Sequence, residues 1–340
     1  MALEYTKSEA KEWARENMKG VCNVIMPSFT SDLRAINEPA IRFDVRRCIE
    51  LGFWGSLVVA ECSTTKEEYK RFLEIVIDEA KGRLRTVVHG SFDTLDDVAE
   101  INRFAESAGA DVLLTTYAPN FYPKSQEDIR DYTEKVLAGT NLASIIFSVH
   151  QWGFGRLHPS DIRVDIVKEL ADIPNAVAVK AEGGPPGNGA IVEILDAVGD
   201  KLLVSDPREA SAPGFVKWFG MQWMGTSNFE AFGNVVPTYF KQMHDGNWTA
   251  AMENYWKIHG IRTRRLADMA SFAGANFIHR ASWKYQGWLN GFNGGPMRLP
   301  TMRLSAHGTA PLREAMIKAG TIPADTPADM SGFYVGRNPA

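Results

Sequence analysis

The chain has 340 residues, of which 45% are apolar and 23% are charged, the balance of an ordinary soluble globular protein. This length allows one large domain with an appendage, or two domains. The formal net charge of −4 excludes the basic surface that nucleic-acid-binding proteins need, and no apolar run reaches the roughly 18 residues of a membrane span. We therefore expect neither a nucleic-acid nor a membrane partner.

The first segment, residues 1–19, is charged throughout and lacks the apolar centre of a signal peptide. Its pattern predicts a helix that precedes the main domain. The three cysteines, Cys22, Cys48 and Cys62, are odd in number and show no CxxC spacing, which favours thiols in a reducing compartment. We therefore expect a cytoplasmic protein.

Eight short apolar runs follow, separated by segments with helical patterns. The runs lie near residues 22–26, 56–60, 84–89, 111–116, 143–149, 176–180, 201–205 and 222–227. One helix is predicted over 66–83 with a stop at Gly82, and another begins with Ser160 as its N-cap. After residue 246 the strand patterns stop and helical patterns continue towards the C-terminus.

This alternation predicts a (β/α)8 TIM barrel over residues 20–246, with the helix of residues 1–19 before it and a C-terminal helical subdomain over 247–340 after it. An open, doubly wound sheet is the main alternative, but no GxGxxG follows the first strand. Active sites of (β/α)8 barrels lie at the C-terminal ends of the strands, so the residues at those ends are the candidates.

Polar side chains follow every predicted strand. Those of Glu61, His89, His150 and Asp206 could ligate a metal ion, although no HxH pair or other tight ligand spacing supports such a site. Cys62 could be a nucleophile, but no local histidine motif supports that role. We predict that the protein uses no metal and no cofactor.

Lys180 ends the sixth run, "VAVK", although a lysine is costly to bury. Strand alternation places it on the side of Ala178 and opposite Val179, so it points into the barrel mouth if the valines pack on helices. Burial lowers the pKa of an amine from about 10.4 towards neutrality, and a neutral amine can form an imine with a ketone. The alternative is a structural ion pair with Glu182 or Asp206.

The segments "GVCNVIMPSF", "NAVAVKAEGG" and "GMQWMGTSNFEAFGN" resemble the dihydrodipicolinate synthase and N-acetylneuraminate lyase superfamily of class I aldolases. The resemblance covers most of residues 20–300 and implies a homotetramer. It implies that Lys180 forms a Schiff base with pyruvate or another 2-oxo acid, so that a neighbouring C–C bond is made or cleaved. The "GFNGGPMRLP" segment looks closest to the hydratase-aldolases that split arylidene-pyruvates into an aromatic aldehyde and pyruvate.

The same resemblance implies residues that bind the substrate. The family's carboxylate-binding motif corresponds to "AECSTTKEE", which makes Ser63, Thr64 and Thr65 candidates together with Glu61. The "GTSNF" segment looks like the end of the family's eighth strand and adds Asn228 as a candidate.

The family's proton-relaying tyrosine on strand 5 falls at Phe147, and a phenylalanine has no proton to relay. We predict that His150 or Tyr117 supplies the missing acid/base group. We also predict an aromatic pocket for a substrate that carries a ring, although packing is the other interpretation of these side chains. The rings in question lie near strand ends and belong to Trp54, Phe147, Trp152 and Trp223.

Several functions follow from these alternatives. The favoured one is an imine-forming lyase, an aldolase or hydratase-aldolase with an aromatic aldehyde partner. A hydratase or dehydratase could act on a 2-oxo acid through the same imine. A metal-dependent barrel hydrolase could use the strand-end Glu, His and Asp residues. A small-molecule-binding protein without catalysis is the remaining alternative.

Overall fold

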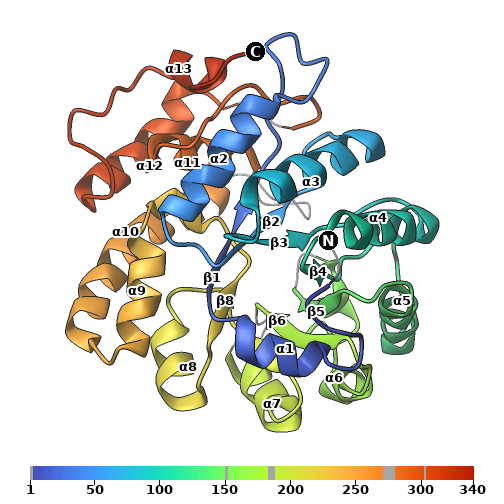
Figure 1. Cartoon of the computed structure of the whole chain (residues 1–340). Helices are drawn as coiled ribbons and strands as arrows, with labels where there is room; N and C mark the ends of the chain where they lie inside the picture. The colour runs from blue at the N-terminus through green and yellow to red at the C-terminus, as the bar shows by residue number, and fades with distance from the viewer. Residues whose placement is uncertain (1–2, 150–151, 183–187, 271–279, 302–303) are drawn as a thin grey trace. The chain divides into compact units, whose positions relative to one another are not determined.

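A computed structural model describes residues 3–149, 152–182, 188–270, 280–301 and 304–340 (Figure 1). All eight predicted strands are present: β1 (Gly20–Ile25), β2 (Gly55–Val58), β3 (Arg85–Val88), β4 (Val112–Leu114), β5 (Ala143–Ser148), β6 (Ala176–Ala181), β7 (Leu203–Ser205) and β8 (Trp223–Gly225). They form one sheet in the order β7-β6-β5-β4-β3-β2-β1-β8. The Gly225 N–H donates to Ser205 Oγ (3.4 Å), which joins β8 to β7, the two ends of that order. The predicted (β/α)8 barrel is therefore confirmed.

Two compact units make up the structure, and the first comprises Met1–Cys22 and Arg85–Thr226. Its helices are α1 (Ala10–Asn17), α4 (Leu95–Ala108), α5 (Gln126–Ala138), α6 (Val164–Ala171), α7 (Asn188–Val198) and α8 (Ala212–Phe219), with a 3-10 turn η2 (Phe154–Arg156). In this unit the strand pairs β1–β8, β3–β4, β4–β5, β5–β6 and β6–β7 are parallel. Every residue of β5 and β6 is buried, which explains their continuous apolar runs.

The helix predicted within residues 1–19 is α1, which the preceding residues fasten to the sheet. The Tyr5 hydroxyl donates to the Asp111 carbonyl (2.6 Å) and accepts from the Ala143 N–H (2.7 Å). Because these bonds satisfy backbone groups at the starts of β4 and β5, the N-terminal segment covers the strand ends opposite to the candidate site.

The second unit comprises Asn23–Leu84 and Ser227–Ala340. Its helices are α2 (Glu38–Glu50), α3 (Lys66–Ala80), α9 (Val235–His244), α10 (Trp248–Ala270), α11 (Arg280–Leu289), α12 (Ala306–Lys318) and α13 (Ser331–Val335), with a 3-10 turn η3 (Phe229–Phe232). In the C-terminal part, α9 and α10 run side by side (Figure 1). The rings of Tyr285, Trp288 and Phe333 pack together and attach α13 to α11.

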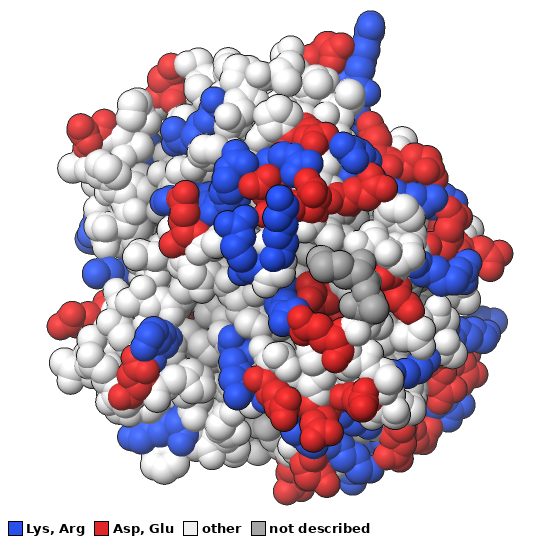
Figure 2. All heavy atoms as spheres, in the orientation of Figure 1, with Lys and Arg blue, Asp and Glu red and all other residues white. Residues whose placement is uncertain are grey.

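A network of charged side chains connects α2 with α3. Arg42 contacts Glu38 (2.8 Å) and Asp78 (2.5 Å), and Arg71 contacts Glu38 (2.6 Å). Figure 2 shows acidic and basic side chains interleaved over these two helices. Exposed pairs of this kind contribute little each, so the buried apolar faces of α2 and α3 supply most of the stability.

Two predicted helix boundaries differ from the structure. The helix expected over 66–83 is α3, which ends at Ala80 with Lys81 as a left-handed C-cap. The prediction that Ser160 caps a helix is wrong, because α6 begins at Val164. The side chain of Gln126 holds this segment instead: its Nε2 donates to the Asp161 carbonyl (2.8 Å), and its Oε1 accepts from the Arg163 N–H (2.9 Å).

In the described part of the chain, no helix is both long and apolar enough to cross a membrane. Cys22, Cys48 and Cys62 all lie in this part; they are buried, and none forms a disulfide.

Candidate active site

Lys180 is buried near the C-terminal end of β6, and its side chain is only 3% exposed. It is the register partner of Phe147 on β5 and of Ser205 on β7. Register partners on neighbouring strands project to the same face, so these three side chains form a row. The Lys180 amine lies 3.8 Å from the centre of the Phe147 ring. The structure therefore places a buried amine against an aromatic ring at a strand end.

Glu182 provides a carboxylate contact for this amine. The Lys180 Nζ donates to Glu182 Oε1 at 2.7 Å, and the Glu182 side chain is 22% exposed. The two residues are two apart along the chain, so strand alternation places both on one side. The ion-pair alternative for Lys180 is thus present in the structure, and it brings a proton acceptor next to the candidate nucleophile.

Asp206, the other predicted ion-pair partner, is bound by Arg208 instead. The Arg208 backbone N–H and Nε donate to Oδ1 (both 2.9 Å), and Nη2 donates to Oδ2 (2.7 Å). Asp206 is fully buried, and three charge-assisted bonds compensate for that burial. Of the two predicted partners, Glu182 is therefore the one that contacts Lys180.

Trp152 continues the aromatic surface beside Lys180. Its ring packs edge-on against Phe147, with 6.0 Å between the ring centres. Its buried indole N–H has no hydrogen-bond partner among the described residues. An unsatisfied buried donor is costly, so this N–H is suited to a polar atom of a ligand.

Tyr117 lies in an aromatic cluster with its hydroxyl turned towards α5. The Thr133 Oγ1 donates to the Ile129 carbonyl (2.8 Å), so the Tyr117 hydroxyl donates to Thr133 Oγ1 (2.9 Å). The Tyr117 ring packs against those of Trp152 and Phe154. Burial raises the pKa of the phenol above its ordinary value, so it holds its proton tightly. Among the described residues, the hydrogen bond of this hydroxyl leads to Thr133 on α5.

The other predicted relay, His150, lies outside the described residues. Of the remaining residues predicted as possible metal ligands, His89 is buried at the end of β3 and Asp206 is bound by Arg208. Across the described ranges, no three His, Cys, Asp or Glu side chains gather as a metal site requires.

In the second unit, Glu61 and Cys62 follow β2. Glu61 is ion-paired with Arg280 of α11, with 2.6 Å between Oε2 and Nη2. Burial raises the pKa of the Cys62 thiol to about 11. A thiol that stays protonated at neutral pH is a poor nucleophile, which disfavours the cysteine alternative.

The three candidate hydroxyls that follow are each engaged in bonds within the chain. Ser63 Oγ donates to the Arg298 carbonyl (3.3 Å), and Thr64 Oγ1 donates to the Ala60 carbonyl (3.0 Å). Thr65 is the N-cap of α3: its Oγ1 accepts from the Glu68 N–H (3.2 Å), and the Glu68 carboxylate accepts from the Thr65 N–H (3.0 Å). This capping box gives Thr65 a structural role.

Asn228, the candidate beyond β8, is fully buried and connects three helical residues. Its Oδ1 accepts from Arg262 Nη1 (2.6 Å) and from Arg265, both on α10, and its Nδ2 donates to Gln286 Oε1 (3.3 Å) on α11. Its amide therefore positions two guanidinium groups.

Two of the four rings predicted to line an aromatic pocket lie at the N-terminal ends of their strands. Trp54 comes directly before β2, and Trp223 is the first residue of β8 and only 1% exposed. Both are at N-terminal ends of strands, whereas barrels of this class bind substrates at the C-terminal ends. Phe147 contacts the Lys180 amine and Trp152 packs against Phe147, so these two rings support the predicted aromatic pocket.

A second buried lysine, Lys284 on α11, was not among the predicted site residues. Its side chain is 4% exposed, and its amine donates to the Pro27 carbonyl (2.9 Å) after β1. Burial lowers its pKa, although Asp44 acts in the opposite direction. Any test of imine formation therefore has to distinguish an adduct at Lys180 from an adduct at Lys284.

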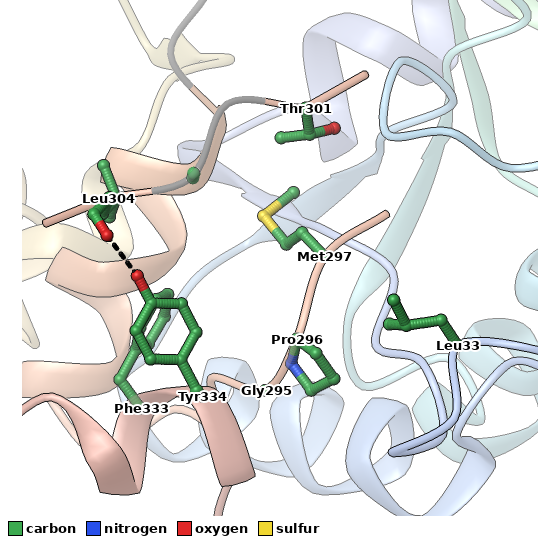
Figure 3. A pocket seen from close by; sticks show the side chains of 9 residues that line it. Leu33, Gly295, Pro296, Met297, Thr301, Leu304, Phe333 and Tyr334 are labelled. Atoms are coloured by element: carbon green, nitrogen blue, oxygen red, sulfur yellow. Dashed lines mark hydrogen bonds between the residues drawn. The ribbon is translucent and has the colours of Figure 1, made fainter. Parts of the chain in front are cut away.

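The second unit also contains a cavity of about 420 Å³, in the size range of small-molecule sites. Figure 3 shows Met297 in its middle, with Leu33 and the ring of Tyr334 facing it from different sides. Thr301 also lines the cavity, and its Oγ1 lies 3.3 Å from Ser63 Oγ. Periodic patterns did not predict this cavity because the irregular segment after α11 forms most of its wall.

Comparisons with known proteins agree with this geometry. The sequence profile of the dihydrodipicolinate synthetase family matches residues 19–314. The 4-hydroxy-tetrahydrodipicolinate synthase of Methanopyrus kandleri is 29% identical over 248 residues, which cover 71% of this chain and 78% of that protein.

Two solved structures show the same fold. The N-acetylneuraminate lyase from Fusobacterium nucleatum has a TM-score of 0.73 at 20% identity, covering 88% of this chain and 98% of the other. The structure of PhdJ bound to a substrate intermediate has a TM-score of 0.75 at 18% identity, covering 94% of this chain and 98% of the other.

Proposed function

Because the chain belongs to the dihydrodipicolinate synthetase family, we propose that Lys180 is the amine that forms an imine with a pyruvate-type 2-oxo acid. Members of this family are class I lyases that use a lysine Schiff base, and the chain is such an enzyme. The contact of the buried Lys180 amine with Glu182 carries the assignment, because it joins a nucleophile to a proton acceptor at a strand end.

The chemistry follows from the imine. The neutral amine attacks C2 of the 2-oxo acid, and water leaves as the iminium forms. When the C3–C4 bond breaks, its electron pair moves to the iminium nitrogen as an enamine forms, and the C4 hydroxyl loses its proton to give an aldehyde. Protonation at C3 and hydrolysis then release the 2-oxo acid and the lysine. A hydratase or dehydratase step on a 2-oxo acid uses the same imine.

For the aldehyde partner we propose an aromatic ring, which makes the reaction that of a hydratase-aldolase. Phe147 and Trp152 support this proposal: the Phe147 ring contacts the amine, the Trp152 ring packs against Phe147, and the indole N–H has no partner among the described residues. Aromatic pairs contribute on the order of 1 kcal/mol each beyond the area they bury.

A substrate panel tests this function. Pyruvate release is measured from aryl-substituted 2-oxo acids and from sugar acids, together with synthesis of the product for which the curated relatives are named. We expect the aryl substrates to be cleaved fastest and the Lys180→Arg variant to be inactive, because a permanently charged guanidinium cannot attack a ketone. Efficient cleavage of sugar acids without cleavage of aryl substrates would contradict the aromatic assignment.

The proposed reaction requires no metal, because the iminium withdraws the electrons that a divalent ion would otherwise polarise. We expect full turnover after extensive treatment with EDTA. Loss of turnover that zinc or manganese restores would instead support the metal-dependent hydrolase.

The other predicted residues keep their proposed roles in this scheme. Ser63, Thr64 and Thr65 with Glu61 are candidates for the substrate carboxylate, and Asn228 is a candidate through the arginines that it positions. The exception is the pair predicted for proton transfer during C–C cleavage, His150 and Tyr117: we propose His150 for this role, because the Tyr117 hydroxyl donates to Thr133 Oγ1.

We further propose a cytoplasmic homotetramer. Large apolar side chains on two helices support an assembly, since Trp218 on α8 is 73% exposed and Trp256 on α10 is 63% exposed. Light scattering of the purified protein should give four times the mass of the chain. A monomer at micromolar concentration would contradict the proposal.

A further inference from the structure

We infer that Glu182 is a catalytic residue, the acid/base group that moves protons to and from Lys180. The inference rests on the proposed function, because it assumes that the Lys180 amine is the reacting group. Glu182 contacts that reacting atom directly, with 2.7 Å between Oε1 and Nζ, which is within reach for proton transfer.

The geometry favours proton transfer between Glu182 and the Lys180 amine over a purely electrostatic role for Glu182. Lys180 is 3% exposed and Glu182 is 22% exposed, so the acid can exchange its proton with solvent while the amine cannot easily do so. The other face of the amine is covered by the ring of Phe147, which has no exchangeable proton. A buried ammonium is not a nucleophile, so a neighbouring base has to remove one proton before attack.

Among the described residues, Arg208 is a charged group near Glu182 besides Lys180. Arg208 interacts electrostatically with Glu182, but its hydrogen bonds go to Asp206. Asp206 is therefore neutralised by Arg208, and Glu182 keeps its contact with Lys180.

The proton balance is complete within the proposed step. The Glu182 carboxylate takes one proton from the Lys180 ammonium, and the neutral amine adds to the C2 carbonyl of the 2-oxo acid. This addition leaves a positively charged nitrogen and an alkoxide, and one proton passes from the nitrogen to the alkoxide, so that the carbinolamine nitrogen regains its electron pair. Glu182 then gives its proton to the C2 hydroxyl. The C–O bond then breaks, water leaves, and the nitrogen lone pair forms the iminium bond. Hydrolysis runs the same transfers backwards.

The test uses pyruvate alone, so it does not depend on the identity of the aldehyde. Imine and enamine formation exchange the methyl protons of pyruvate for deuterium in D2O, which proton NMR follows over a range of pH. We expect Glu182→Gln to slow exchange by about 10² and to lose the acid limb of the wild-type pH profile, and Glu182→Asp to keep that limb at an intermediate rate. Glu193→Gln, a change of an exposed carboxylate on α7, is the matched control and should exchange like wild type.

Exchange by Glu182→Gln at the wild-type rate, with the wild-type pH profile, would overturn the inference. Borohydride trapping separates this failure from failure of the proposed function. If wild type gives no reduced pyruvate adduct, Lys180 is not the reacting amine and both fail. If wild type is trapped and Glu182→Gln is trapped equally fast, only the role of Glu182 fails. Should Glu182→Gln not fold, Glu182→Asp decides, because a purely structural pair predicts an unchanged pH profile for that variant.

Discussion

At the scale of single residues, variants of Tyr117 can show whether its hydroxyl has a structural or a catalytic role. It donates to Thr133 Oγ1 in a fully buried cluster, so its removal should lower the free energy of unfolding by about 1 kcal/mol. Thr133→Val should cost more, because it leaves the buried phenol of Tyr117 without this acceptor. Urea denaturation of Tyr117→Phe, Thr133→Val and the double variant measures both effects.

We expect turnover close to wild type in all three variants, because the Tyr117 hydroxyl donates to Thr133 on α5. If Tyr117→Phe alone slows turnover by about 10² while Thr133→Val does not, the phenol is the proton relay after all. His150→Asn serves as the companion variant, since it tests the other predicted relay under the same assay.

Of the two buried lysines, the burial of one could be predicted from the sequence and the burial of the other could not. Lys180 could be predicted because it ends an apolar strand, so its position alone indicates burial. Lys284 could not, because the helix "RASWKYQGWL" mixes polar and apolar residues, and the burial of its amine depends on packing against the Pro27 carbonyl, far away in sequence. The contact with Glu182 could be anticipated from alternation, whereas the proposal that Glu182 acts in catalysis needed the 2.7 Å distance in the structure.

At the scale of elements, the start of α3 depends on the capping box of Thr65 and Glu68. Thr65→Ala removes the acceptor for the Glu68 N–H and should lower the free energy of unfolding by about 1 kcal/mol, whereas Thr65→Ser should keep the cap. Thermal or urea denaturation measures the loss. If the hydroxyl also binds the substrate carboxylate, the KM for pyruvate should rise in Thr65→Ala. If Thr65→Ala loses stability but keeps the wild-type KM, Thr65 acts only as the cap of α3.

Element types could be predicted better than element boundaries. All eight strands appear where short apolar runs end in polar residues, because such runs are buried on both faces of a parallel sheet. The start of α6 was misplaced because the side chain of Gln126, distant in sequence, holds the backbone around Asp161. Trp54 precedes its strand, as predicted, and Trp223 begins its strand, so both rings lie at N-terminal strand ends.

At the scale of the whole molecule, one buried carboxyl makes stability depend on pH. Glu230 in η3 is 2% exposed, and burial raises its pKa from 4.5 to about 8. Between these values the folded protein keeps a proton that the unfolded chain releases. Glu230 should therefore lower the free energy of unfolding as the pH rises between about 4.5 and 8, contributing a slope near 1.4 kcal/mol per pH unit that levels off above.

Glu230→Gln removes this titration. Relative to wild type, the variant should gain about 3 kcal/mol of stability between pH 5 and pH 7.5, measured by urea denaturation at both values. Glu193→Gln, on the exposed face of α7, should follow wild type throughout. Parallel pH curves for wild type and Glu230→Gln would contradict the account.

The most direct test of the central claim is to locate the imine on the chain. Borohydride is added to the enzyme with pyruvate, and peptide mass spectrometry locates the reduced adduct. We predict an adduct at Lys180, visible as a lysine that trypsin no longer cleaves, none at the buried Lys284, and no adduct in Lys180→Arg. An adduct at Lys284 that persists in Lys180→Arg would contradict the assignment of Lys180 as the reacting amine.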